Sequence, residues 1–303
     1  MTGDAFERLT TGLEIPLWPS VPPGTPRDMG QRVVQNSSDV VFFHHMSVSH
    51  ISRPSLMVIR PEKPNGMAMI IAPGGGYSRI TLEVEGRDIA DWFGQFGVTC
   101  FLLTYRLPSE GHENGKDVPM MDAQRAVRLV RANASRWGLD ADRIGLVGAS
   151  AAGHMASSII SEGEQLLNAP VDEVDGLSAR PDFAILLYPV VTLEDPFAHV
   201  DSRTCLLGKG AGEELVRQYS SQQRITKNAP EVFLVLADDD PAVPADNSIL
   251  LYQALRRAGV KAEMHIFRDG GHGFGIRATN GLPVSGWPAL CRAWLKRIGM
   301  LEE

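Results

Sequence analysis

The sequence lacks the features that mark a disulfide-bonded, membrane-spanning or nucleic-acid-binding protein. Its 303 residues include three cysteines, Cys100, Cys205 and Cys291, an odd number spaced too widely for a disulfide framework or a zinc knuckle. It has no run of about 18 apolar residues that would span a bilayer. The net charge of -7 comes without the clustered Lys and Arg that phosphate binding requires. We therefore expect neither a nucleic-acid nor a membrane partner.

The N-terminal region also lacks a secretory signal. Residues 1–19 carry acidic side chains early and show no basic start followed by an apolar stretch, so a cytoplasmic location is expected unless a leader was removed from a secreted or periplasmic protein. Repeated prolines prevent regular helix in residues 1–38 and predict an extended N-terminal arm. These are Pro16, Pro19, Pro22, Pro23 and Pro26.

Apolar runs of strand length alternate with amphipathic stretches of helix length over the rest of the chain, which predicts an α/β fold with a doubly wound, mostly parallel sheet of about eight strands flanked by helices. The expected helices cover residues 87–96 and 118–137. The expected strands cover residues 40–43, 56–60, 68–72, 98–105, 144–149, 183–189, 232–237 and 262–267. Residues 39–303 read as one domain, with an irregular stretch at 190–228 as a small insertion beside the substrate pocket.

Two of the expected strands run into small-residue turns. After 144–149 comes Gly148-Ala149-Ser150-Ala151-Ala152-Gly153, close to the G-x-S-x-G turn that exposes a nucleophilic serine, although Ala152 replaces the last glycine. A helix cap is the simpler reading of this turn taken alone. After 68–72 comes Pro73-Gly74-Gly75-Gly76-Tyr77, whose backbone N–H groups suit an oxyanion hole, and no Walker spacing supports a nucleotide loop.

Two later strands are followed by acidic and imidazole side chains. Three aspartates, residues 238–240, follow the strand at 232–237, and any of them could orient a histidine. His272 lies in a glycine-rich loop after the strand at 262–267 and could accept a serine proton. The chain order serine, aspartate, histidine is that of α/β-hydrolases. A cation site at the aspartates, or one at His44, His45 and His50, lacks a set of converging ligands, so we expect no metal and no cofactor.

The sequence resembles the α/β-hydrolase esterases grouped with acetyl xylan esterases and other carbohydrate acetyl esterases. The resemblance runs through most of the chain, including Pro73-Gly74-Gly75-Gly76-Tyr77, Glu85-Gly86, Gly148-Ala149-Ser150-Ala151-Ala152-Gly153, Asp240-Pro241-Ala242-Val243-Pro244 and Gly271-His272-Gly273-Phe274.

The resemblance implies the roles of individual residues. It selects Asp240, which stands three residues before a Val-Pro pair, to join Ser150 and His272 as the catalytic triad. It assigns the oxyanion N–H groups to Gly75, Gly76 and Ala151, and it favours short acyl groups, particularly acetyl on sugars. Apart from the resemblance, the aromatic side chains of Tyr77 and Trp18 are expected to border the pocket as platforms for a sugar, with Tyr77 binding substrate.

The expected function is therefore a serine esterase that acts on a small-molecule or saccharide ester. Two alternatives stay open. One is a serine peptidase of the prolyl oligopeptidase type, which shares this catalytic domain. The other is a ligand-binding protein that has kept the fold and lost catalysis. The sequence does not decide between a monomer and a homo-oligomer, and it leaves the natural substrate open.

Overall fold

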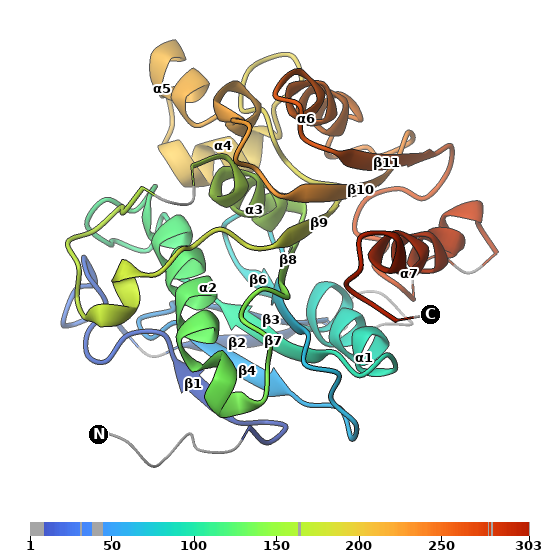
Figure 1. Ribbon diagram of the computed structural model, residues 1–303. Helices are drawn as coiled ribbons and strands as arrows, with labels where there is room; N and C mark the ends of the chain where they lie inside the picture. The colour runs from blue at the N-terminus through green and yellow to red at the C-terminus, as the bar shows by residue number, and fades with distance from the viewer. Residues whose placement is uncertain are drawn as a thin grey trace.

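A central sheet of eight strands organises the chain (Figure 1). The computed structural model describes residues 9–30, 32–37, 45–162, 165–277, 279 and 281–302. β4 pairs antiparallel with both of its neighbours, and the remaining pairs are parallel. The strands lie in the order β1 (Glu14–Pro16), β4 (Ser55–Ile59), β7 (Thr99–Thr104), β5 (Ala68–Ala72), β8 (Ile144–Ala149), β9 (Phe183–Leu187), β10 (Glu231–Ala237) and β11 (Ala262–Phe267).

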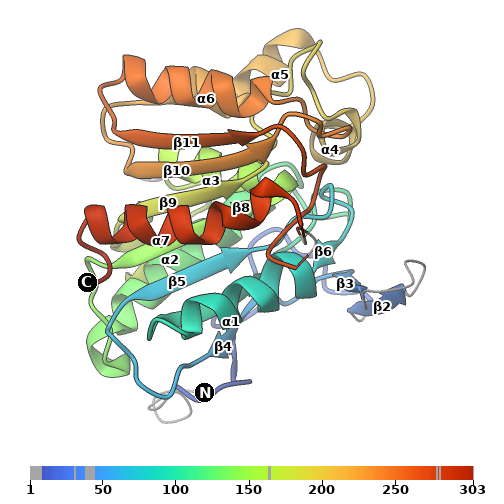
Figure 2. The same cartoon turned by 90° about the vertical axis from the view of Figure 1, so that its right-hand side faces the viewer.

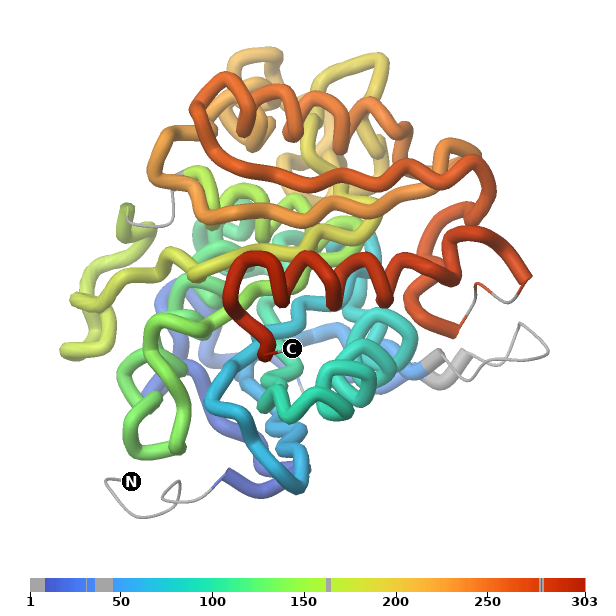
Figure 3. Tube along the Cα trace, turned by 45° about the vertical axis from the view of Figure 1, so that its right-hand side comes forward, coloured from blue at the N-terminus to red at the C-terminus, as the bar shows by residue number. Residues whose placement is uncertain are grey.

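Helices cover both faces of this sheet and create two cores. Successive side chains of a strand point to opposite faces, so Ile70 of β5 belongs to one core and Met69 to the other. One core is covered by α2 (Val118–Trp137), α3 (Ser150–Glu162) and α6 (Asp246–Arg257), and the other by α1 (Asp88–Gly94) and α7 (Trp287–Arg297). Figure 3 shows α1 and α7 side by side, where the rings of Trp92 and Trp287 lie 5.9 Å apart. Coverage on both faces explains why the central strands are apolar throughout.

The predicted α/β-hydrolase architecture is confirmed. The strands expected at 68–72, 144–149 and 262–267 and the helix expected at 118–137 have the observed bounds of β5, β8, β11 and α2. The helix expected at 87–96 is α1, preceded by a π-helical turn, η1 (Glu83–Arg87). The strand expected at 40–43 lies outside the described residues.

The N-terminal segment is more deeply integrated than the expected surface arm. β1 pairs with β4 and forms the edge of the main sheet, a position that tolerates Pro16 because an edge strand is paired on one side only. Ile15, Leu17 and Trp18 are buried. The Trp18 Nε1–H donates to Asp122 Oδ1 at 2.8 Å, which ties the segment to α2. The division into a 1–38 arm and a 39–303 domain stays a prediction.

Two small substructures lie at the end of the sheet toward which the parallel strands point (Figure 2). A second, antiparallel sheet consists of β2 (Val33–Ser37), β3 (His45–Ser49) and β6 (Ile80–Thr81). The stretch expected as an insertion, 190–228, contains α4 (Val200–Leu207), α5 (Glu213–Gln218) and a 3-10 turn, η3 (Ser221–Arg224). Further 3-10 turns are η2 (Glu173–Gly176) and η4 (Pro283–Gly286). The loops that follow the central strands, together with β6 and α4, surround the carboxyl ends of those strands.

Candidate active site

Ser150 occupies a strained turn between β8 and α3. Its φ of 51° is left-handed, which costs a residue with a side chain about 1 to 3 kcal/mol. The turn is tight because Gly148 has no side chain, and an added Cβ there would lie 2.6 Å from both the Ala152 carbonyl oxygen and the Ala156 Cβ. Strain of this kind holds a side chain clear of the helix that follows.

Ala152, the departure from the usual glycine pattern, is fully buried in the core with α2 and α3. The close approach falls one residue later, at Gly153, where an added Cβ would lie 2.5 Å from the Pro189 Cβ. The methyl group of Ala152 is therefore accommodated by core packing, and the second glycine of the turn is needed at Gly153.

Ser150, His272 and Asp240 form one continuous hydrogen-bonded chain. The Ser150 Oγ lies 2.8 Å from His272 Nε2, and His272 Nδ1 lies 2.6 Å from Asp240 Oδ2. An ionised carboxylate can only accept, so Nδ1 carries the proton and Nε2 is left to accept from the serine hydroxyl. This is the tautomer that a general base requires. The structure thus brings together the three residues predicted as a triad from positions far apart in the chain.

The surroundings of Asp240 favour its ionised form. Its side chain is only 1 % exposed, and burial by itself raises the carboxyl pKa. The hydrogen bond and charge of His272 and the N–H groups of Val243 and Ala242 outweigh burial, so the pKa lies below its usual range. Those N–H groups donate to Oδ1 at 2.9 and 2.8 Å and fix the carboxylate in place.

The glycine loop after β5 packs directly on the serine turn. A Cβ added at Gly74 would lie 2.8 Å from the Ser150 Cβ and 2.7 Å from the Ala149 carbonyl oxygen. Gly75 and Gly76 have φ angles of 134° and 66° and line the same cavity as Ser150 and His272. Within the described residues no acceptor takes the N–H of either glycine. Both N–H groups are therefore free to donate to a ligand, and their role as the oxyanion hole stays a prediction.

Ala151, the third residue predicted to line that hole, follows Ser150 at the start of α3 and is fully buried. The first N–H groups of a helix have no acceptor within the helix, so its backbone can serve a ligand beside Ser150.

Glu85 and Tyr188 support the site, although neither was predicted to have a role in it. The Glu85 Oε2 accepts the Gly74 N–H at 2.9 Å and the Thr81 hydroxyl at 2.7 Å. The ring of Tyr188 packs edge-on against His272 with centroids 5.0 Å apart. Burial, followed by the charge of Glu85, raises the pKa of Tyr188 well above its usual range, so its hydroxyl stays neutral. The sequence did contain a signal for Glu85, because Glu85-Gly86 is one of the motifs that carry the family resemblance.

Tyr77 does not border the pocket, the position that was predicted for it from the sequence. It is fully buried and is not among the residues that line the cavity around Ser150. The reason is His154, whose Nε2–H donates to the Tyr219 carbonyl at 2.6 Å and whose Nδ1 therefore accepts from the Tyr77 hydroxyl at 2.9 Å. Tyr77 anchors the glycine loop to α3 instead of bordering the pocket.

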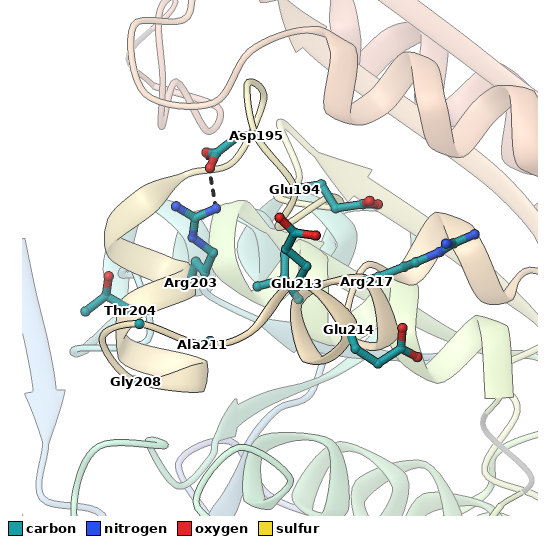
Figure 4. A pocket seen from close by; sticks show the side chains of 11 residues that line it. Glu194, Asp195, Arg203, Thr204, Gly208, Ala211, Glu213, Glu214 and Arg217 are labelled. Carbon is teal, nitrogen blue, oxygen red and sulfur yellow. Dashed lines mark ion pairs between the residues drawn. The ribbon is translucent and has the colours of Figure 1, made fainter.

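A cavity of about 680 Å³ opens above Ser150. The glycine loop after β5 contributes Gly75, Gly76 and Arg79 to its lining. The residue before α4 contributes His199, and α4 itself contributes Asp201, Thr204 and Cys205. Thr204 also lines a second cavity, of about 650 Å³. Figure 4 shows that cavity with the ion pair between Asp195 and Arg203, whose charged atoms lie 3.1 Å apart. The helix α4 therefore contributes to the walls of both cavities.

The described part of the chain contains neither a cluster of metal-binding side chains nor a membrane-spanning helix. No group of three or more His, Cys, Asp and Glu side chains there is arranged to hold a metal ion. No helix there combines the length and the apolar character needed to cross a bilayer. Of the three early histidines, His44 lies outside the described residues, and the backbone N–H of His50 donates to Glu110.

Comparison with known proteins agrees with this geometry. The sequence model of the BD-FAE family matches residues 61–255, and that of the dienelactone hydrolase family matches residues 212–303. The fold resembles the crystal structure of an acetyl ester-xyloside bifunctional hydrolase from Caldicellulosiruptor lactoaceticus, with a TM-score of 0.77 and 32% identity over 96% of this chain and 98% of that one. The sheet order and the serine turn define the α/β-hydrolase class.

Within that class, the chain belongs to the BD-FAE family. It is 32% identical over 235 residues to an acetylxylan esterase from Xylanibacter ruminicola, covering 76% of this chain and 46% of the relative. It is 32% identical over 219 residues to endo-1,4-beta-xylanase B from Butyrivibrio fibrisolvens, covering 72% and 34% respectively. The chain thus spans less than half the length of these two curated relatives. The predicted resemblance to carbohydrate acetyl esterases is confirmed.

Proposed function

We propose that the protein hydrolyses carboxylic esters through a covalent acyl-enzyme. The observation that carries the proposal is the pair of hydrogen bonds, 2.8 Å and 2.6 Å long, that connects Ser150, His272 and Asp240 beside an open cavity. The arrangement needs no movement to transfer the serine proton.

The chemistry follows from that geometry. His272 takes the proton of Ser150 as the hydroxyl oxygen attacks the ester carbonyl, and Asp240 stabilises the resulting imidazolium. The N–H groups of Gly75, Gly76 and Ala151 hold the oxyanion of the tetrahedral intermediate. His272 then protonates the leaving alcohol. Water, activated by the same imidazole, releases the acid and restores Ser150.

Short acyl esters of sugars are the substrates that we propose. The support comes from the printed names of the relatives, an acetylxylan esterase and an acetyl ester-xyloside hydrolase. The cavity is open at the surface and lined by polar residues from α4, which is compatible with an alcohol that carries hydroxyl groups. A cytoplasmic location remains a prediction.

The decisive experiment measures hydrolysis of acetylated xylo-oligosaccharides, 4-nitrophenyl acetate and aminoacyl 4-nitroanilides. We expect both acetyl esters to be cleaved and the anilides to be left intact. Ser150→Ala should lose up to about a millionfold in kcat. Preferred cleavage of the anilides would show that the protein is a peptidase and not an esterase. A wild-type protein inert toward all three would favour the catalytically silent alternative.

A further inference from the structure

His199 forms the N-cap of α4 and lies in the wall of the cavity that holds Ser150 and His272. Its Nδ1 accepts the Ser202 backbone N–H at 3.3 Å and lies 2.8 Å from the Ser202 Oγ. Ser202 is fully buried, so this contact fixes the imidazole ring against the helix.

The contact with Ser202 also fixes the tautomer of His199. A backbone N–H can only donate, so Nδ1 is the accepting nitrogen and the proton of the neutral ring resides on Nε2. Among the residues that the structure describes, Nε2 has no hydrogen-bond partner. His199 therefore offers one free donor at the wall of the cavity.

His199 stays neutral beside the triad. Burial lowers its pKa below the usual value, and the positive charge that His272 carries when protonated lowers it further. His199 and His272 line the same cavity.

The alcohol part of an ester must lie near His272 in this cavity. His272 returns its proton to the departing alcohol oxygen, so the alcohol has to be within reach of His272 during acylation. The same wall carries Asp201 and Thr204, whose side chains have no hydrogen-bond partner within the described parts of the chain. A donor, a carboxylate and a hydroxyl on one wall suit several hydroxyl groups on one ligand.

We propose that His199 is a specificity-determining residue whose Nε2–H donates to an oxygen of the alcohol part of the substrate, while Asp201 and Thr204 accept from its hydroxyl groups. The substrate class that fits this wall is an ester of a polyhydroxylated alcohol. This inference rests on the proposed esterase function and adds the residues that distinguish a sugar ester from a simple one.

The test compares two esters with the same acyl group, acetylated xylobiose and 4-nitrophenyl acetate, whose alcohol has no free hydroxyl. The variant is His199→Asn, because Asn remains a good N-cap for α4 but is too short to replace the Nε2 donor. We expect kcat/KM for acetylated xylobiose to fall at least about tenfold, mainly through KM, and kcat/KM for 4-nitrophenyl acetate to change less than about twofold. Xylobiose should inhibit 4-nitrophenyl acetate hydrolysis less in the variant than in the wild type.

The control is His50→Asn, the same substitution outside this cavity, at a position whose φ of 56° Asn tolerates. It should leave both substrates unaffected. Equal losses on both esters in His199→Asn, or no loss on either, would overturn the role of His199 and leave the esterase intact. A wild-type enzyme that cleaves 4-nitrophenyl acetate but neither cleaves acetylated xylobiose nor is inhibited by xylobiose would overturn both this inference and the sugar ester proposal.

Discussion

The carboxylate of Asp239 accepts the backbone N–H of Gly271 at 2.7 Å, one residue before His272. It also accepts the N–H of Gly270 at 2.9 Å. The neighbouring Asp240 contacts the His272 ring itself. Adjacent carboxylates therefore have separate tasks, since one holds the histidine loop and the other holds the histidine.

Replacing each of the three aspartates by asparagine should separate these two tasks, because the substitutions should lower kcat by different amounts. Asp240→Asn should lower kcat by about 10⁴, because the amide cannot hold the same imidazole tautomer. Asp239→Asn should cost much less, about tenfold, since it loosens a loop without touching the ring. Asp238→Asn is the matched control and should behave as wild type. Steady-state kinetics with 4-nitrophenyl acetate gives the order, and an Asp239→Asn loss as large as that of Asp240→Asn would contradict it.

Gly75 should not tolerate a side chain. Its φ is 134°, and an added Cβ would lie 2.3 Å from the Arg79 carbonyl oxygen, so Gly75→Ala must shift the loop that carries the proposed oxyanion donors. Loss of one such donor lowers kcat by about 10² to 10³. Gly94→Ala is the control, because its Cβ would meet nothing within 4 Å. A kcat of Gly75→Ala close to that of the wild type would show that this loop does not form the oxyanion hole.

The stability of the fold should fall as the pH drops from about 6.5 to about 4. Burial lowers the pKa of His154 from 6.5 to about 4, so within this window the unfolded chain binds a proton that the folded protein does not. The free energy of unfolding then decreases with falling pH, by up to about 3 kcal/mol from this residue. Above about pH 6.5, His154 makes its full contribution to the free energy of unfolding.

Urea denaturation at pH 7 and at pH 4.5 checks this dependence. His154→Gln removes the titrating ring, so the variant should be less stable at pH 7 and should lose less stability on acidification. The same acid-induced loss in wild type and variant would assign the effect to other groups, among them His112, whose pKa is also lowered to about 4, by burial and then by Arg106.

The sequence predicted best what depends on local pattern. β5, β8 and β11 are short apolar runs, and α2 has a regular helical spacing that ends at Gly138 with a φ of 69°. The serine, aspartate and histidine each follow a strand at its carboxyl end, so the topology of a parallel sheet brings them to one edge. This is why residues 122 positions apart, Ser150 and His272, could be paired from the motifs at the strand ends and their order in the chain, whereas Asp240 was selected by the family resemblance.

The sequence failed where a long-range contact decides the outcome. Tyr77 looked accessible in its glycine loop, but the contact with His154, 77 positions away, turns it into the interior. The edge strand β1 has three residues and one buried side chain, too little for a periodic signal. His199 stands alone in an irregular stretch, and the sequence does not show that it lines the same cavity as His272.

The most direct test of the account is to label the protein with a fluorophosphonate and locate the adduct by peptide mass spectrometry. We expect one adduct, on Ser150, with labelling abolished in Ser150→Ala and strongly slowed in His272→Ala, because the imidazole activates the hydroxyl. An adduct at another residue, or equal labelling of Ser150→Ala and wild type, would contradict the assignment of Ser150 as the nucleophile.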